Sequence, residues 1–391
     1  MKRYKELFSK SPDSLLFLYF NIFFYLSMSL SRTVHSIWFD LNGQLLNYSI
    51  SYSAMAFSGM FAGILGKRIN NFNLSNIIKV GILLYSVGLL LRLFPNSWIV
   101  SLLSGLISGI GAATIILLLR TWVVSLGGKE DRAVTISLKR FSSSLGTSIG
   151  GILSGVLLYC FLNIFHNFTY PLVLGLASII SLLTFLLVPK IEKQVENDEI
   201  EEVDTKNQDS HMKKKIIFFG VMAGLIASLF SPYLPVILKR QSISEVFIGP
   251  ILTLLSILTI YFSALFSSKK IDVNKQKYYI LSELFISIFS LFLIIKLKYY
   301  FLIIILIFRI FFVNLSSITQ ELMELSIYPK TKISHYYGIS QTSYFIGDAI
   351  GGFVGGWLFN QSMSYSIWLF VVLLVINAIL FRIFYIQNSN R

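Results

Sequence analysis

Long apolar segments follow one another along almost the whole chain, and they restrict the fold more than any other feature. A helix needs about 20 mostly apolar residues to cross the hydrocarbon core of a bilayer. Twelve segments meet this need: residues 14–38, 44–65, 76–94, 97–126, 133–162, 170–188, 215–238, 246–267, 278–295, 299–328, 335–359 and 363–386. In lipid, backbone N–H and C=O groups must be satisfied within their own segment, which favours helices. The sequence therefore predicts an all-α membrane protein with twelve transmembrane helices.

The positions of the basic residues decide what the formal net charge of +14 means. If the termini and every second loop share one side of the membrane, 24 of the 33 Lys and Arg residues lie there and only 5 on the other side. Short basic loops stay in the cytoplasm. We therefore expect both termini in the cytoplasm, a bilayer as surroundings and no nucleic-acid partner. Frequent Ile, Lys, Asn and Phe suggest a low-GC bacterium, so we expect the membrane to be a bacterial plasma membrane.

One long polar stretch divides the twelve segments into six and six. It covers residues 189–214, is acidic in its centre and basic at its end, and has few apolar residues. Such a composition is typical of a flexible linker. The sequence predicts an amino-terminal bundle over residues 1–188, a cytoplasmic linker over 189–214 and a carboxyl-terminal bundle over 215–391.

Glycines in the fifth and eleventh segments indicate an internal repeat that relates the two halves. The fifth segment reads SLGTSIGGILSGVL from Ser144, and the eleventh reads FIGDAIGGFVGGWL from Phe345. At an offset of 201 residues, four glycines match four others: Gly146, Gly150, Gly151 and Gly155 correspond to Gly347, Gly351, Gly352 and Gly356. Glycines at this spacing let helices approach closely. The predicted fold is thus two pseudo-symmetric six-helix bundles, with gating faces at these glycines: Gly150, Gly151, Gly351 and Gly352.

In architecture the chain resembles the major facilitator superfamily, which has six plus six helices, a central cytoplasmic linker and glycine-rich fifth and eleventh helices. Its short motifs depart from the family's pattern. GKRINNF from Gly66 has Lys67 where an Asp is expected, and GLISGIGAA from Gly105 lacks the Arg of the fourth helix. The resemblance implies a transporter whose helices 1, 4, 7 and 10 line a central cavity. It leaves the subfamily and the coupling direction open.

Charged side chains inside the apolar segments are the candidates for a functional site, since each costs about 3 kcal/mol at the centre of a membrane helix. Most of them lie in the first, fourth, tenth and eleventh segments: Arg32, His35, Arg120, Arg309, Glu321, Glu324 and Asp348. Those of the third, sixth, ninth and twelfth segments are expected near helix ends: Lys79, Arg92, Glu283 and Arg382.

The first segment carries a polar face. Asn21, Tyr25, Arg32 and His35 lie on one side of it at helical spacing. Arg32 either anchors the helix at the outer headgroups or lines a cavity together with the others. The candidate substrate-binding residues from both halves are Asn21, Tyr25, Arg32, Arg309, Gln341 and Tyr344.

Arg309 and Asp348 are predicted at nearly the same depth, close to the middle of the membrane. On its own segment, Asp348 shares a face with Gln341 and Tyr344. Two interpretations stay open. The two charges either form a permanent ion pair, or Asp348 is protonated when substrate takes Arg309.

Two further carboxylates, Glu321 and Glu324, lie towards the cytoplasmic end of the tenth segment. They either form gating ion pairs with neighbouring cations, among them Arg120, or accept protons. The candidate proton-coupling residues are therefore Asp348, Glu324, Glu321 and His35.

The distribution of charge favours an anionic substrate. The amino-terminal half contributes Arg and His but no candidate carboxylate, and Arg binds planar oxyanions in a bidentate manner. No glycine loop that binds nucleotide phosphates is present, so we expect an ion gradient as energy source and no cofactor. The histidines show neither metal-ligand spacing nor a Ser or Cys partner, which argues against a metal site and an enzyme.

We therefore predict a monomeric secondary transporter that exports a small anionic or zwitterionic amphiphilic organic molecule. The expected mechanism is proton antiport with alternating access. Export is favoured because the chain resembles the efflux branch of the family in length. Proton-symport uptake of a small organic anion and a lipid flippase are the alternatives, and the substrate is not identified by the sequence.

Overall fold

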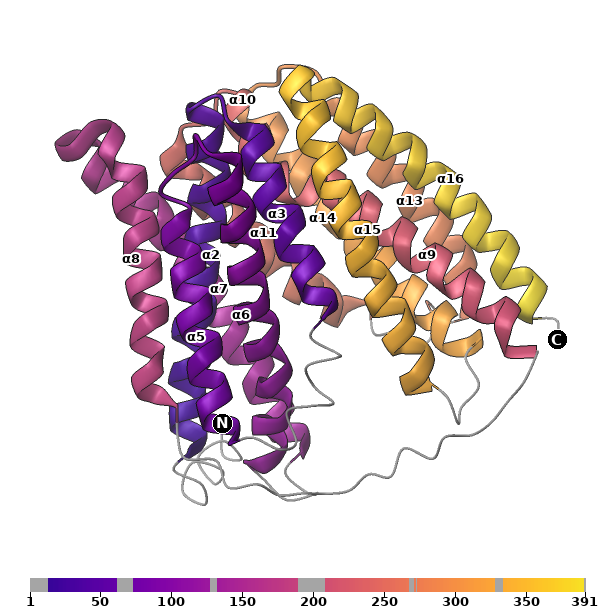
Figure 1. Cartoon of the computed structure of the whole chain (residues 1–391). Helices are drawn as coiled ribbons and strands as arrows, with labels where there is room; N and C mark the ends of the chain where they lie inside the picture. Colours follow the sequence, from indigo (N-terminus) through magenta and orange to yellow (C-terminus); the bar gives the residue numbers. More distant parts are fainter. Residues whose placement is uncertain are drawn as a thin grey trace. The chain divides into compact units, whose positions relative to one another are not determined.

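The computed structural model describes residues 13–61, 73–126, 132–188, 208–266, 271, 273–327 and 333–389. Within these ranges the chain is helical and has no β-strand (Figure 1). The principal helices are α2 (Asp13–Leu41), α3 (Leu45–Met60), α5 (Leu74–Leu91), α6 (Trp98–Ser125), α7 (Arg132–Phe165), α8 (Thr169–Leu183), α9 (Gln208–Phe230), α10 (Leu234–Arg240), α11 (Glu245–Leu265), α13 (Lys275–Phe292), α14 (Tyr299–Ile327), α15 (Ile333–Gln361) and α16 (Met363–Ser389). The twelve predicted segments correspond to these helices, with α9 and α10 together forming the seventh.

Local sequence explains where several helices begin or break. At the start of α5, the side chain of Asn73 accepts a hydrogen bond from the backbone N–H of Ser75, which caps the helix. Between α9 and α10, Pro232 and Pro235 lack backbone donors. A short 3-10 turn over Ser231–Tyr233 therefore interrupts the seventh segment.

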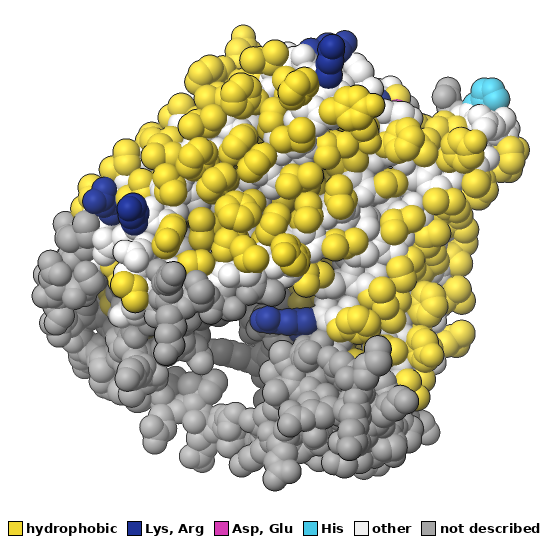
Figure 2. All heavy atoms as spheres, turned by 180° about the vertical axis from the view of Figure 1, so that it is seen from behind, with side chains coloured by type: hydrophobic (Ala, Val, Ile, Leu, Met, Phe, Trp, Pro, Cys, Tyr) yellow, Lys and Arg dark blue, Asp and Glu magenta, His cyan; other side chains and the backbone are white. Residues whose placement is uncertain are grey.

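The surface of the helices is that of a membrane protein. Among the described residues, nine helical segments are long and apolar enough to cross a bilayer. Figure 2 shows one face covered largely by hydrophobic side chains, with only a few Lys or Arg side chains on it. An apolar surface of this extent would not be tolerated in water. The chain is thus a multi-pass membrane protein, as predicted.

The helices form two compact units. The first contains the described residues of Met1–Val203 together with Glu245–Thr253. Within it, α2 packs against α7 and α8, and α6 packs against α3 and α5. The indole of Trp122 on α6 contacts the rings of Phe17 and Phe20 on α2, with centroids 5.1 and 5.3 Å apart. These aromatic contacts join α2 to α6 in the core of the unit.

The second unit contains the described residues of Asp204–Ser244 together with Leu254–Arg391. In it, α9 packs against α15 and α16, while α13 packs against α14 and α16. The first helix of each half therefore packs on the fifth and sixth helices of the same half. This repeated pairing agrees with two pseudo-symmetric bundles.

The glycine repeat explains how closely the paired helices approach. On α7, a Cβ atom at Gly146 or Gly150 would overlap a backbone carbonyl oxygen of α2. On α15, a Cβ atom at Gly347 or Gly351 would overlap a backbone carbonyl oxygen of α9. Glycine is needed because any other residue would force the two backbones apart. Matched glycines thus hold the first and fifth helices together inside each unit.

Candidate functional site

The predicted polar face of α2 contains both packing residues and exposed residues. Asn21 is fully buried, and its Nδ2 donates a hydrogen bond of 2.6 Å to Ser142 Oγ on α7. Tyr25 is half-buried, and Arg32 is exposed. Asn21 therefore connects two helices of the first unit. Substrate binding by these three side chains stays a prediction.

Arg92, at the carboxyl end of α5, is a buried cation of the first unit. Only 5% of its surface is exposed. Its Nη1 donates to Ser31 Oγ at 2.8 Å, and its Nη2 makes longer contacts with Ser108 Oγ (3.5 Å) and Met55 Sδ (3.6 Å). Its Nε has no hydrogen-bond partner in the described part of the chain. These partners are neutral groups from three other helices, so none of them offsets the charge.

His35 lies one helical turn after Ser31 on α2 and interacts electrostatically with this cation. The imidazole is buried edge-on against two aromatic rings, with centroid distances of 4.5 Å to Phe39 and 4.9 Å to Tyr48. Its Nε2 has no hydrogen-bond partner among the described residues. We call Arg92, His35, Ser31, Ser108 and Met55 the Arg92 centre.

Glu283 is a second buried ionisable residue. The prediction that it lies near a helix end is wrong. It lies in the middle of α13 and is only 5% exposed. Its Oε1 accepts a hydrogen bond from the hydroxyl of Ser316 on α14. Its Oε2 and the hydroxyl of Tyr279, one helical turn earlier, have no hydrogen-bond partner within the described ranges. The carboxyl group therefore faces the protein interior with one oxygen available.

Arg309 on α14 points into the second unit rather than into lipid, with 9% of its surface exposed. Its Nε donates to Ser290 Oγ on α13 at 2.9 Å, and its Cζ lies 3.6 Å from the ring centroid of Phe230. It also interacts electrostatically with Glu283. A desolvated cation over an aromatic ring gains about 2 kcal/mol. We call Glu283, Tyr279, Ser316, Arg309 and Ser290 the Glu283 centre.

Asp348 and its neighbours occupy the part of α15 that packs on α9. The backbones of Tyr344 and Asp348 lie against Gly224, where no Cβ atom could fit. Asp348 is buried, Tyr344 is half-buried and Gln341 is exposed. The guanidinium of Arg309 contacts Ser290 and the rings of Phe230 and Phe370. The two interpretations of Arg309 and Asp348, a permanent ion pair or protonation of Asp348, both stay predictions.

Glu324 and Glu321 differ in their surroundings. Glu324 is half-buried and accepts a hydrogen bond of 2.8 Å from Gln320 Nε2, whereas Glu321 is exposed. The side chain of Arg120 and residues 328–332 lie outside the described residues. The predicted gate at this end of the protein is therefore still a prediction.

The four predicted gating glycines have packing contacts inside their own units. Gly150 and Gly351 belong to the close helix pairs described above. Gly151 faces Thr253, and the carbonyl oxygen of Gly352 accepts a hydrogen bond of 2.6 Å from the hydroxyl of Tyr233. Their part in gating stays a prediction.

The sequence holds a signal for Glu283 but not for Arg92. Ser282, Ser287 and Ser290 share the buried face of α13 with Glu283. A row of small hydroxyl residues on one side of an apolar helix is typical of a surface that faces protein rather than lipid. Arg92 follows the last residue of α5, and its serine partners come from α2 and α6, so the sequence of its own helix does not identify them.

Two repeated helical bundles with buried charges inside apolar surroundings define a polytopic membrane transporter. The sequence model of the Major Facilitator Superfamily matches residues 14–327. The chain belongs to this family, and it is therefore a transporter rather than an enzyme, as predicted. No curated protein sequence matches it.

Solved structures of transporters share the fold. The nucleoside transporter NupG superposes with a TM-score of 0.73 at 14% identity, covering 97% of this chain and 99% of that chain. A bacterial homologue of the human lysosomal transporter Spinster superposes with a TM-score of 0.70 at 12% identity, covering 97% of this chain and 98% of that chain. The D-xylose–proton symporter superposes with a TM-score of 0.67 at 13% identity, covering 94% of this chain and 95% of that chain. At these identities the similarity shows the fold alone.

Proposed function

We propose that the protein exports a small anionic or zwitterionic amphiphilic organic molecule in exchange for protons. It acts as a monomer in a bacterial plasma membrane, with both termini in the cytoplasm, and works by alternating access. The observation that carries this proposal is the buried guanidinium of Arg92, whose described partners are all neutral.

Arg92 supports an acidic group on the substrate. A buried ion whose charge is not offset costs several kcal/mol. A carboxylate or phosphate would offset it, accepting from Nε, which has no described partner, and from one Nη in place of a serine. Such bidentate pairing matches the planar guanidinium, and His35 offers a further ring nitrogen beside it. The amphiphilic character agrees with the phenyl and phenol rings around His35.

Replacing Arg92 with Gln should reduce kcat/KM for an anionic substrate about 30-fold or more, because a charged hydrogen-bonding partner is worth about 2–5 kcal/mol. The melting temperature of the substrate-free protein should stay equal or rise, since the variant removes a buried charge without a counter-ion. Transport of radiolabelled aromatic carboxylates and organic phosphates into proteoliposomes measures the first effect. Thermal unfolding in detergent measures the second.

Arg140→Gln is the matched control for this variant, because Arg140 is exposed on α7. It should transport like the unchanged protein. If Arg92→Gln instead melts at a clearly lower temperature and loses transport of charged and uncharged compounds alike, Arg92 is a structural residue and the proposed anion site is wrong.

Glu283 supports coupling to protons. It is a buried carboxyl group with one oxygen free of described partners and a cation, Arg309, within electrostatic range. A carboxyl group in this position can change its charge only by taking up or releasing a proton, and Arg309 responds to that change. Asp348, buried on α15, is the second candidate for the same task.

Export by antiport and uptake by symport differ in the charge that they move. Exchange of one monoanion outward for one proton inward carries two positive charges inward. Moving one charge across a membrane potential of about 100 mV is worth about 2.3 kcal/mol, so the two charges together gain roughly 4.6 kcal/mol from that potential. Symport of one monoanion with one proton moves no net charge, so the membrane potential does not drive it.

Proteoliposomes with a potassium diffusion potential therefore test the direction. For antiport, we expect an inside-negative potential to accelerate the efflux of a preloaded aromatic carboxylate, together with proton entry reported by an internal pH dye. A potential-independent flux in which protons accompany the anion would replace antiport by symport. A flux of fluorescent phospholipid between leaflets, without any flux of soluble anions, would indicate a flippase instead.

A further inference from the structure

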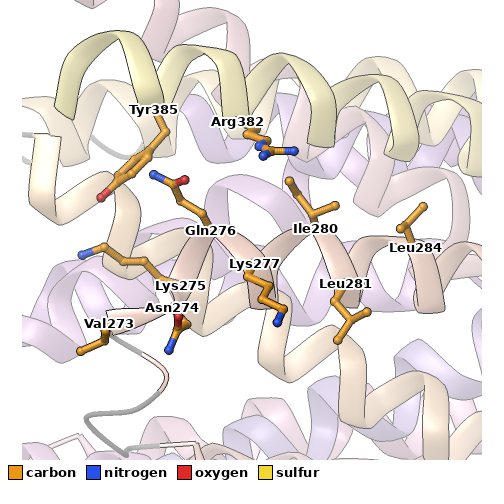
Figure 3. A pocket seen from close by; sticks show the side chains of 10 residues that line it. All are labelled: Val273, Asn274, Lys275, Gln276, Lys277, Ile280, Leu281, Leu284, Arg382 and Tyr385. Carbon is orange, nitrogen blue, oxygen red and sulfur yellow. The ribbon is translucent and has the colours of Figure 1, made fainter. Parts of the chain in front are cut away.

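An open hollow lies between the first turns of α13 and the last turns of α16 in the second unit (Figure 3). Its volume is about 650 Å³. The lining combines basic, amide and apolar side chains: Val273, Asn274, Lys275, Gln276, Lys277, Ile280, Leu281, Leu284, Arg382 and Tyr385. This hollow takes no part in the Arg92 or Glu283 centres.

The polar end of the hollow is positively charged. Lys277 on α13 and Arg382 on α16 are both exposed, and in the described structure neither makes a hydrogen bond or an ion pair through its side chain. Lys275 adds a third basic residue to the lining, and none of the lining residues is acidic. Figure 3 shows the amide of Gln276 and the ring of Tyr385 between the two helices. These groups could receive an anion that brings several acceptor oxygens.

The other end of the hollow is apolar and open. Leu281 and Leu284 follow Lys277 at four and seven residues, so the three side chains lie on one face of α13. Both leucines are exposed, 40% and 47% respectively. At 1.5 Å per residue, Leu284 lies about 10 Å along the helix from Lys277. A cationic end thus continues into an exposed apolar strip on the same helix face.

We propose that this hollow binds an anionic phospholipid. The phosphate contacts Lys277 and Arg382, the glycerol part lies near Gln276, and an acyl chain follows Leu281 and Leu284. A soluble phosphate would bind only at the basic end and would not contact the two leucines. A phospholipid contacts both the basic end and the leucines. The basic loops indicate that these helix ends face the cytoplasm, the leaflet side on which basic residues attract anionic headgroups.

Binding of phosphatidylglycerol to the purified full chain, measured by native mass spectrometry with phosphatidylcholine as reference, tests the proposal. Replacing both cations, Lys277→Gln with Arg382→Gln, should weaken phosphatidylglycerol binding on the order of 30-fold, about fivefold for each cation. The matched control is Lys296→Gln with Lys298→Gln, which removes two exposed cations at the other end of the same unit. The control should bind phosphatidylglycerol like the unchanged protein.

Three outcomes would overturn the proposal. Equal phosphatidylglycerol binding by both double variants would show that these cations recognise no headgroup. Equal binding of phosphatidylcholine and phosphatidylglycerol would remove the role of charge. Displacement of phosphatidylglycerol by glycerol phosphate at equal concentration would identify a site for soluble phosphates instead, whereas weaker lipid binding by Leu281→Asn with Leu284→Asn would support the acyl-chain contact.

Discussion

Alanine in place of Gly347 should lower the free energy of unfolding by about 3 kcal/mol, at the upper end of the usual cost of overpacking. The added methyl group would overlap the backbone carbonyl of Val221 and approach the backbone of Leu225. A backbone cannot rotate out of the way as a side chain can. The close pair of α15 and α9 therefore has to separate, and the separation costs contacts along both helices. Thermal or denaturant unfolding of the purified protein in detergent measures the change.

Gly338→Ala is the matched control, because Gly338 lies on the same helix and has open space where a Cβ atom would be added. Alanine is favoured over glycine in helices by about 0.8–1.0 kcal/mol, so this variant should be as stable as the unchanged protein or more stable. The two substitutions are chemically identical, but they should change the free energy of unfolding in opposite directions. Equal shifts for both would show that helix propensity, not the close approach of two backbones, determines what Gly347 contributes.

The architecture follows from the sequence because it rests on properties that lie along the chain. The length of the apolar segments predicts the helices, and the glycine pattern at an offset of 201 predicts the repeat. The structure shows the physical reason for the pattern, since Gly146 and Gly347 each face the backbone of the first helix in their own half. The break at Pro232 is a local departure that the apolar pattern does not reveal.

The candidate site follows only in part, because the surroundings of a charge depend on helices that are distant in the sequence. Position along the helix predicts Arg309 and Asp348 at nearly the same depth, but it does not predict that Arg309 faces α13 and the ring of Phe230. Proximity to a segment end makes Arg92 look like an interfacial residue, yet three other helices enclose it. Helical position gives only an expected depth, and the direction of a side chain is set by packing.

Replacing Glu283 with Gln should uncouple transport from protons. The amide has the shape of a protonated carboxyl group and can still accept the hydrogen bond from Ser316, but it cannot release a proton. Substrate accumulation driven by a pH gradient should therefore fall at least about 100-fold, corresponding to a loss of roughly 2.7 kcal/mol of coupling. Exchange of labelled for unlabelled substrate needs no net proton movement and should continue. Both fluxes can be measured in the same proteoliposomes.

Asp348→Asn is measured beside it, and Asp13→Asn serves as the control because Asp13 is exposed in the first turn of α2. The control should retain both fluxes. If Glu283→Gln abolishes exchange as well as accumulation, Glu283 acts structurally, for example by balancing the charge of Arg309 inside the second unit. If Asp348→Asn loses accumulation but keeps exchange, and Glu283→Gln does not, the proton is carried on α15. The sequence-based choice of Asp348 is then right, and the choice of Glu283 is wrong. Uncoupling by Glu283→Gln with intact exchange would place the proton between α13 and α14, beside the hydroxyl of Tyr279.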